Sequence, residues 1–235
     1  GPDDQGFWRD EKVQIYFGHN RLSILDLSQA GKQPMKSSCG RYIITFNGEI
    51  YNHLEIRNLL EMKSIIKWRG TSDTETLIET ISLLGLDETL KKIRGMFSFG
   101  LYDKKNKEIS LVRDRFGEKP LYLLNLKNKL FAFASEISSF KYIKEFSPIV
   151  NEAAASCFFK RGWIAAPLSI WENITKVLPG HVVKIKKDTF GHYNIKSESS
   201  YWNCEEIAHL NQNSMYKGSF EDGIDDLQNL FFNVF

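Results

Sequence analysis

Two pairs of short strands, each joined by a polar turn, limit the fold of this chain more than any other feature. Segments 96–102 and 109–112 are rich in aromatic and β-branched residues and flank the polar residues 103–108, which is typical of a β-hairpin. Segments 121–126 and 130–134 repeat the pattern around a second short polar turn. Antiparallel strands of this kind, beside separate helices, favour a layered α+β domain over a parallel, doubly wound sheet.

Two segments between the predicted strands carry the signals of a helix. Ser72 and Glu75 have the spacing of a capping box ahead of an apolar run with helical periodicity, and Gly85 lies where that helix should end. Asn52 and Glu55 have the same spacing, and the apolar residues after them also recur at helical intervals. We therefore expect two helices that begin at these caps.

The remaining regular elements are predicted from the same two periodicities. Strands are expected over 13–17, 42–46 and 181–185, where apolar and polar side chains alternate or β-branched and aromatic residues cluster. A further helix is expected over 151–159, with Gly162 just beyond its end. These elements complete one α+β domain.

The polar, turn-rich segment 203–223 marks the expected boundary of this domain. It separates the regular pattern that closes at Trp202 from an amphipathic run over 224–235. We expect one domain over 1–202 and, over 203–235, a linker followed by the first helix of a second domain. Both ends are expected to be truncated, because the chain begins without Met and stops in an apolar run.

Charge and residue spacing exclude several function classes. The 31 basic and 29 acidic residues leave a net charge of +2, which lacks the basic excess that binds phosphate backbones. No apolar run reaches the roughly 20 residues that span a bilayer. Cys39, Cys157 and Cys204 are far apart and the histidines are scattered, so neither a disulfide framework nor a metal site is expected. We predict no nucleic-acid partner, no membrane segment and a reducing, cytoplasmic location.

Asn47 and Gly48, in the segment FNGEIYNH, can be interpreted in two ways. Asn-Gly is a strong signal for a tight hairpin turn, and the residue types alone favour that interpretation. A predicted helix rather than a pairing strand follows at Asn52, however, which argues against a hairpin. In the alternative, the Asn47 side-chain amide and the Gly48 backbone N–H form an oxyanion hole that points at one developing negative charge.

Arg21, Glu49 and Asp73 form a second constellation if the segments RLSILDLS, FNGEIYNH and SDTE meet at one pocket. A guanidinium binds an α-carboxylate through two parallel hydrogen bonds, and two carboxylates can accept hydrogen bonds from an α-ammonium, so the set suits a zwitterion. Taken singly, each residue has a plainer interpretation. Asp73 suits a helix N-terminus, and Arg21 and Glu49 suit solvated surface positions or an exposed ion pair.

Further segments of the sequence, taken together with those above, resemble a known protein family. The chain opens with GPDDQG and continues, after the three segments above, with GMFSFGLYD (95–103), RDRFGEKPLY (113–122) and FASE (133–136). In this order, the motifs resemble the glutamine amidotransferase domain of glutamine-hydrolysing asparagine synthetases over about residues 1–202. The resemblance implies an α+β fold, a four-layer αββα sandwich of the N-terminal-nucleophile hydrolase type, followed by the start of an α/β synthetase domain.

The resemblance also assigns roles to the candidate residues. It implies that the following residues bind glutamine or stabilise its transition state: Arg21 (α-carboxylate), Glu49 and Asp73 (α-ammonium), Asn47 and Gly48 (oxyanion hole), and Ile24 and Leu25 (backbone lining of the pocket). The charged residues of 113–119 have no derivable chemistry, and we expect them to form a structural, buried or interdomain ion-pair network.

The nucleophile of the family is a cysteine at the mature N-terminus, whose own α-amine serves as the base. That residue is not in this sequence, and the resemblance places it on a first strand upstream of Gly1. Cys39, Cys157 and Cys204 cannot replace it, because an internal cysteine has no free α-amine. We therefore expect this chain alone to be inactive.

For the complete parent protein, the resemblance implies an ATP-dependent, glutamine-hydrolysing asparagine synthetase. No cofactor is expected in this chain, whereas ATP and magnesium are implied for the synthetase domain that would follow it. The implied partners are glutamine, that synthetase domain and, in the parent protein, a second copy in a homodimer. Two alternatives stay open: the same fold amidating a sugar acid or another carboxylate in polysaccharide or secondary metabolism, and a non-catalytic fragment that binds glutamine.

Overall fold

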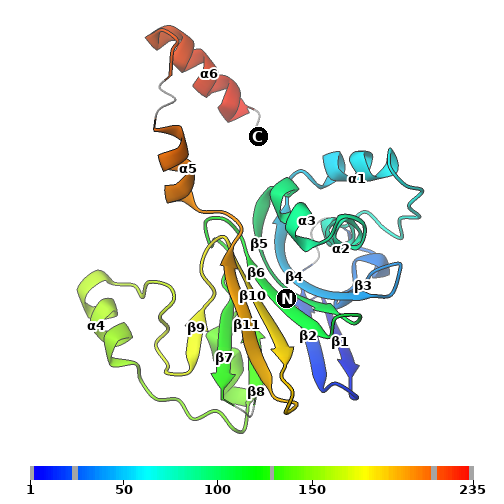
Figure 1. Cartoon of the computed structure of the whole chain (residues 1–235), viewed down its shortest axis with the longest axis vertical. Coiled ribbons are helices and arrows are strands. Elements are labelled where there is room, and N and C mark those ends of the chain that lie inside the picture. The colour runs from blue at the N-terminus through cyan, green and yellow to red at the C-terminus, as the bar shows by residue number, and fades with distance from the viewer. Residues whose placement is uncertain (1–2, 23–25, 128–129, 213–215, 233–235) are drawn as a thin grey trace. The chain divides into compact units, whose positions relative to one another are not determined.

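The computed structural model describes residues 3–22, 26–127, 130–212 and 216–232 of the chain (Figure 1). Contacts divide it into two compact units, Gly1–Trp202 and Asn203–Phe235. The division coincides with the domain boundary that we expected from the loss of regular periodicity after Trp202. Each unit is described by itself.

An antiparallel sheet with strand order β11-β10-β6-β5-β4-β3 is the centre of the first unit. Its strands are β3 (Met35–Lys36), β4 (Tyr42–Ile50), β5 (Gly95–Asp103), β6 (Glu108–Arg113), β10 (His181–Lys187) and β11 (Tyr193–Ser200). The pairing of β5 with β6 confirms the first predicted hairpin. Strand β4 is longer than predicted and continues through Ile50, because it pairs with β5 along its whole length.

Two smaller sheets belong to the same unit. One is the hairpin of β1 (Asp4–Asp10) and β2 (Ile15–Arg21), and the other has the order β8-β7-β9, with β7 (Tyr122–Leu126), β8 (Leu130–Ala134) and β9 (Ile174–Lys176). The pairing of β7 with β8 confirms the second predicted hairpin. Phe17 of β2 and Phe133 of β8 meet edge to face with ring centroids 5.4 Å apart, so the two small sheets touch.

The helices of the first unit include the three that the sequence predicts. They are α1 (His53–Glu61), α2 (Asp73–Leu84), α3 (Leu86–Lys92), α4 (Glu152–Arg161) and the 3₁₀ turns η1 (Gln29–Gly31) and η2 (Ile137–Tyr142). Ser72 caps α2 by accepting from the Glu75 N–H, and Gly85 ends it at a φ of 83°. The Asn52 cap is wrong: its side chain instead bridges Lys92 O and Arg94 N, a contact between distant segments.

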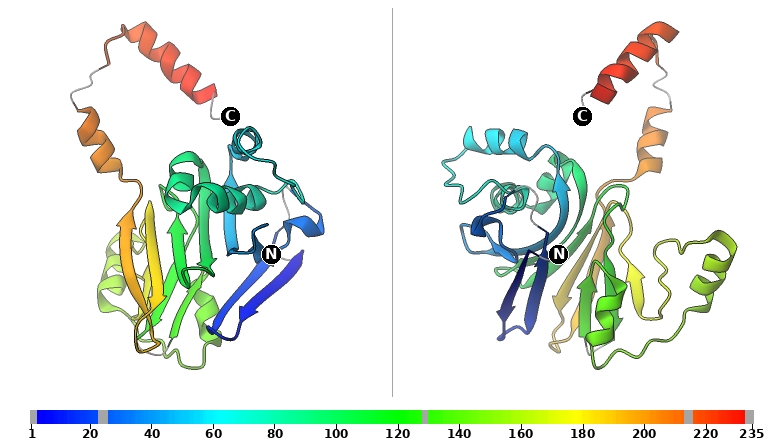
Figure 2. Two further views of the ribbon diagram at one scale, coloured as in Figure 1. Left: turned by 45° about the vertical axis from the view of Figure 1, so that its right-hand side comes forward. Right: turned by 180° about the vertical axis from the view of Figure 1, so that it is seen from behind.

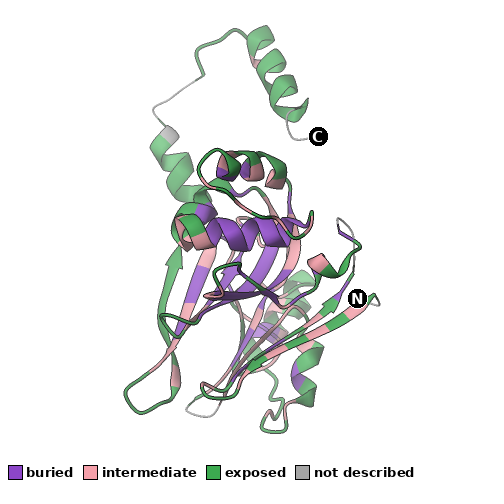
Figure 3. Cartoon of the chain, turned by 90° about the vertical axis from the view of Figure 1, so that its right-hand side faces the viewer, coloured by how far each residue is buried: buried purple, intermediate pink, exposed green. Residues whose placement is uncertain are grey.

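Alternating side chains give the large sheet two buried faces. Ile44, Phe46 and Phe99 pack against Ile78 and Ile81 of α2, which is buried along most of its length (Figure 3). The opposite face packs against both small sheets, and η2 lies on the outer side of the β8-β7-β9 sheet. The layers are therefore helices, large sheet and small sheets, with η2 outermost (Figure 2).

The second unit contains α5 (Cys204–Asn211) and α6 (Phe220–Phe232). The expectation of an irregular linker over 203–223 is wrong at α5, because the Asn203 side chain caps a helix by accepting from the N–H groups of Glu205 and Glu206. The described part of the predicted amphipathic run is helical, and its helix begins earlier than predicted, at Phe220. No helix of the described residues is both long and apolar enough to cross a membrane.

Candidate functional site

Asn47 and Gly48 lie inside a strand rather than in a turn. Asn47 pairs with Ser98 and Gly48 with Phe97 of β5, so the hairpin-turn interpretation is wrong. Gly48 has a φ of 145°, and an added Cβ would collide with the Met96 carbonyl oxygen. Glycine is required here because only it permits this backbone conformation and this close approach of β5.

The Asn47 amide points toward the small sheets. Its Nδ2 donates to the Ser135 hydroxyl oxygen at 3.1 Å, and Ser135 follows β8 directly, in the FASE segment. An amide nitrogen has two N–H donors, so this contact orients the group and uses one of them. Sequence reasoning gave FASE no role, and only the packing of β8 near β4 reveals the contact.

Asp73 and Glu49 lie at neighbouring ends of α2 and β4. Asp73 is buried, and its carboxylate accepts from the N–H groups of Ile50 (2.9 Å) and Thr74 (2.7 Å). Burial raises the pKa of Asp73, and the negative charge of half-buried Glu49 acts in the same direction. Two carboxylates placed together in this way favour a cation such as an ammonium group between them.

His53, the first residue of α1, lies beside this acidic pair. Burial lowers the pKa of His53, while the charge of Asp73 opposes that effect. Its Nδ1 atom is buried without a hydrogen-bond partner among the described residues. The imidazole therefore adds a buried polar atom to the surroundings of Asp73.

Arg21, the last residue of β2, is buried at 8% exposure, so its interpretation as a solvated surface residue is wrong. Its guanidinium donates to the carbonyl oxygens of Asp26 and, at 2.9 Å, of Ser28. These bonds hold the loop that follows β2. Ile24 and Leu25, the predicted backbone lining of the pocket, lie outside the described residues.

The charged cluster over 113–119 is structural, but it is not an ion-pair network. Arg113 donates to the carbonyl oxygens of Gly117, Lys119 and Val177 at 2.7 to 2.9 Å. The Asp114 carboxylate accepts from backbone N–H groups on β5 and in its own loop. None of the ion pairs among the described residues involves this cluster, so its charges bind backbone dipoles instead.

The described part of the chain contains three free cysteines and no group of side chains that could bind a metal ion. Cys39 and Cys204 are exposed, Cys157 is half-buried, and all three are free thiols. The described residues hold no group of three or more histidine, cysteine, aspartate or glutamate side chains that could bind a metal ion.

Known proteins resemble this chain in sequence. The glutamine amidotransferase domain family matches residues 1–202. Asparagine synthetase (glutamine-hydrolyzing) 1 of Bacillus subtilis (strain 168) is 36% identical over 188 residues, which cover 80% of this chain and 29% of that protein. A putative asparagine synthetase (glutamine-hydrolyzing) 2 of Methanocaldococcus jannaschii is 34% identical over 195 residues, covering 75% of this chain and 37% of that protein.

The fold has a known counterpart among solved structures. Glutamine phosphoribosylpyrophosphate amidotransferase from B. subtilis superposes with a TM-score of 0.53 at 19% identity, covering 79% of this chain and 34% of that one. At this identity the likeness concerns the fold alone. The chain belongs to the glutamine amidotransferase domain family. It spans about a third of the length of the curated relatives it matches.

Proposed function

We propose that residues 1–202 are the glutaminase part of an ATP-dependent, glutamine-hydrolysing asparagine synthetase, supplying ammonia from glutamine to amidate aspartate. The observation that carries the proposal is the placement of Asn47 and Gly48 on β4 beside Glu49 and Asp73, in a chain that belongs to the glutamine amidotransferase domain family. A polar amide donor and a pair of carboxylates at one strand end suit an α-amino acid with a reactive side-chain amide.

In the proposed mechanism, each described group acts on one part of glutamine. Glu49 and Asp73 accept hydrogen bonds from the α-ammonium, and Arg21 binds the α-carboxylate with the backbone around Ile24 and Leu25. The γ-carbonyl then lies toward Asn47 and Gly48. When a thiolate attacks that carbonyl, the Asn47 amide and the Gly48 N–H stabilise the oxyanion, and protonation of the leaving nitrogen releases ammonia.

The complete parent protein is proposed to supply what this chain does not contain. Its N-terminal cysteine, on a strand preceding Gly1, would be the nucleophile and its α-amine the base, completing a four-layer αββα domain. The second unit would begin the α/β synthetase domain, where ATP and magnesium are proposed to bind. The described residues hold no group of side chains that could bind the magnesium ion. A cytoplasmic homodimer is the proposed parent assembly.

The test compares two nitrogen sources in the full-length parent protein. Arg21→Ala removes the guanidinium that binds the α-carboxylate of glutamine, and Asp73→Asn removes a negative charge facing its α-ammonium. Each substitution should therefore weaken glutamine binding by about 1.5 to 4 kcal/mol. Free ammonia bypasses the pocket, so ammonia-dependent asparagine synthesis should be unchanged. If both substitutions lowered glutamine-dependent and ammonia-dependent synthesis equally, these residues would hold the fold together and the proposal would be withdrawn. Amidation of a carboxylate other than aspartate would change only the acceptor.

A further inference from the structure

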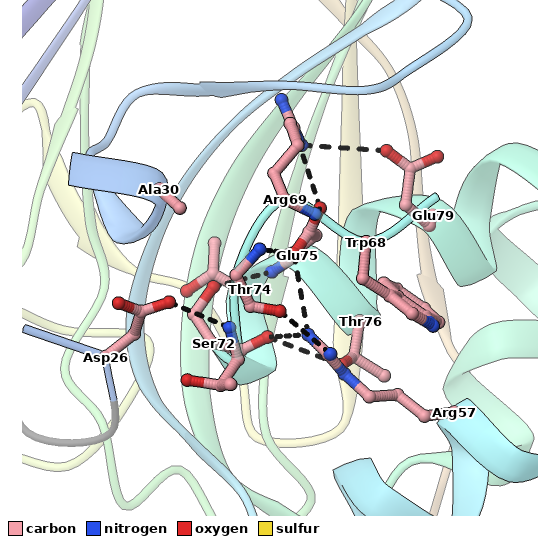
Figure 4. Close-up of polar contacts among 12 residues, drawn as sticks. Asp26, Ala30, Arg57, Trp68, Arg69, Ser72, Thr74, Glu75, Thr76 and Glu79 are labelled. Carbon is pink, nitrogen blue, oxygen red and sulfur yellow. Dashed lines mark hydrogen bonds and ion pairs between the residues drawn. The ribbon is translucent and has the colours of Figure 1, made fainter. Parts of the chain in front are cut away.

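The backbone segment that leads into α2 is bound by buried side chains rather than by neighbouring strands. The carboxylate of fully buried Glu75 accepts from the N–H groups of Arg69 and Gly70 at 2.8 and 3.0 Å. Arg57 donates to the carbonyl oxygens of Gly70 and Ser72 at 2.9 and 3.1 Å, as Figure 4 shows. The backbone just before Asp73 is therefore held by Glu75 of α2 itself and by Arg57 of α1.

Asp26 supplies a further contact to this segment, and it comes from the loop after β2. One of its carboxylate oxygens accepts from the Thr71 N–H at 2.8 Å, which is the dashed line drawn from Asp26 in Figure 4. The other accepts from the Ser28 N–H at 2.8 Å. Its own carbonyl oxygen accepts from the Arg21 guanidinium. Asp26 thus contacts Arg21 on one side and, on the other, the segment that positions Asp73.

Asp26 is built to remain charged and in place. It is only 6% exposed, and hydrogen bonds from Ser28 and Thr71 outweigh burial and lower its pKa to about 2. An added Cβ at Gly70 would collide with its carboxylate and would come within 2.7 Å of the Ala30 side chain. The two backbone segments are therefore packed together without space for a larger side chain, so a shift of one moves the other.

We propose that Asp26 is a positioning residue that fixes the separation of Arg21 and Asp73, and so selects for a ligand with an α-carboxylate and an α-ammonium on the same carbon. This inference rests on the proposed function. Both charged groups of such a ligand share one carbon, so the two side chains that bind them must keep one spacing. A displacement of either side chain therefore weakens its contact with such a ligand and raises the KM.

The chemistry of the contact explains why aspartate is needed at this position. A carboxylate accepts hydrogen bonds on both oxygens, whereas asparagine has one accepting oxygen and one donating nitrogen. In Asp26→Asn, the amide nitrogen would face either the Thr71 N–H or the Ser28 N–H, donor against donor. The substitution therefore removes one of the two backbone hydrogen bonds of the side chain while keeping its size.

The test uses the full-length parent protein with glutamine as the probe. Asp26→Asn should raise the KM for glutamine about tenfold, because one backbone contact of about 1.4 kcal/mol is lost, and should change kcat less than twofold. Asp26→Glu, which keeps the charge and both acceptor oxygens, should give an intermediate KM. Asp188→Asn is the matched control: Asp188 also accepts backbone N–H groups, from Phe190 and His192, but in the β10–β11 turn, and its KM should be unchanged.

Two further results decide between positioning and general support. If Asp26 acts through Asp73, Asp26→Asn should add little to the KM of Asp73→Asn, so the double variant should be non-additive. A KM within twofold of the parent value, or an Asp26→Asn variant that loses kcat as strongly as it gains KM, would overturn the inference. A parent protein that turned over no glutamine would refute the proposed function itself, which distinguishes the two failures.

Discussion

The two ends of the candidate site are held in different ways. At the Asp73 end, the preceding backbone is bound by Asp26, Arg57 and Glu75 through several hydrogen bonds. At the Asn47 end, the functional amide has one side-chain hydrogen bond, to Ser135. Because the network at the Asp73 end is buried, substitutions there should mainly lower the free energy of unfolding. Substitutions at the Asn47 end should mainly lower the rate of glutamine turnover.

Removing Glu75 should produce the largest effect on folding. Glu75→Ala leaves the largely buried Arg57 guanidinium without its ion-pair partner at 3.5 Å and strips two backbone N–H groups of their acceptor. Loss of one partner of a buried pair costs about 3 to 5 kcal/mol. We expect that decrease in the free energy of unfolding of the 235-residue chain, measured in urea.

The control for this experiment is Glu88→Ala, because Glu88 forms an exposed ion pair with Lys91 within α3. Its unfolding midpoint should stay at the parent value, since exposed pairs contribute little. If both variants were equally stable, the network around Glu75 would not support the fold, and the contrast between the two ends of the site would disappear.

Removing the Asn47 amide should act on turnover instead. Asn47→Ala should slow glutamine hydrolysis by the full-length parent protein by a factor on the order of 10² to 10³, because one oxyanion donor is lost. Its free energy of unfolding should change by no more than about 1 kcal/mol, since one neutral hydrogen bond is removed. Asn106→Ala, in the exposed β5–β6 turn, is the control for a neutral substitution. A large loss of stability with unchanged turnover would reverse the comparison.

The sequence predicts the local elements of this fold better than the contacts between them. The start of α2 at Ser72 and its end at Gly85 are encoded within a few residues, so capping and turn signals identify them. Asn47 and Gly48 carry an equally strong local turn signal, yet they lie in a strand, because pairing with β5 about 50 residues later overrides it. Asn52 fails for the same reason, since its side chain is used by a distant segment.

The residues of the candidate site differ in the same way: some can be selected from the sequence, and others are revealed only by contacts between distant segments. Arg21 and Asp73 can be selected in the sequence as residue types that suit a zwitterion, but their burial is seen only in the folded chain, and their role in binding stays a prediction. Asp26 and Ser135 cannot, because their importance depends on Thr71 and Asn47, which reach them only in the folded chain. A short polar side chain that bonds to a distant segment has no local sequence signal, unlike a helix cap.

His19 offers a pH-dependent test of the Asn47 end. It lies on β2 with its Nδ1 3.3 Å from the hydroxyl of Thr45, two residues before Asn47 on β4. Burial lowers the pKa of His19 to about 4. The unfolded chain therefore binds more protons between about pH 6.5 and 4, and stability should fall as the pH falls through that range, by about 2 kcal/mol after screening by water.

The measurement is the free energy of unfolding of the chain across this pH range. His19→Gln should remove most of the decline, because the titrating group is gone, whereas His192→Gln, in the exposed β10–β11 turn, should keep it. An identical pH profile for His19→Gln and the parent chain would show that the decline in stability arises from groups other than His19.

The smallest expected effect belongs to Ser135, whose single hydrogen bond orients the Asn47 amide. Ser135→Ala in the full-length parent protein should lower kcat for glutamine about fivefold, which corresponds to one neutral hydrogen bond of about 1 kcal/mol, and should leave KM unchanged. Ser135→Thr, which keeps the hydroxyl, should restore kcat, and Ser138→Ala, which removes an exposed hydroxyl bonded to Glu136, should have no effect. A rise in KM instead would mean that Ser135 supports the binding end of the site. An unchanged kcat would mean that the glutamine amide itself orients Asn47. The Asp73 end would then be arranged before the substrate binds, whereas the Asn47 end would be arranged only by the bound substrate.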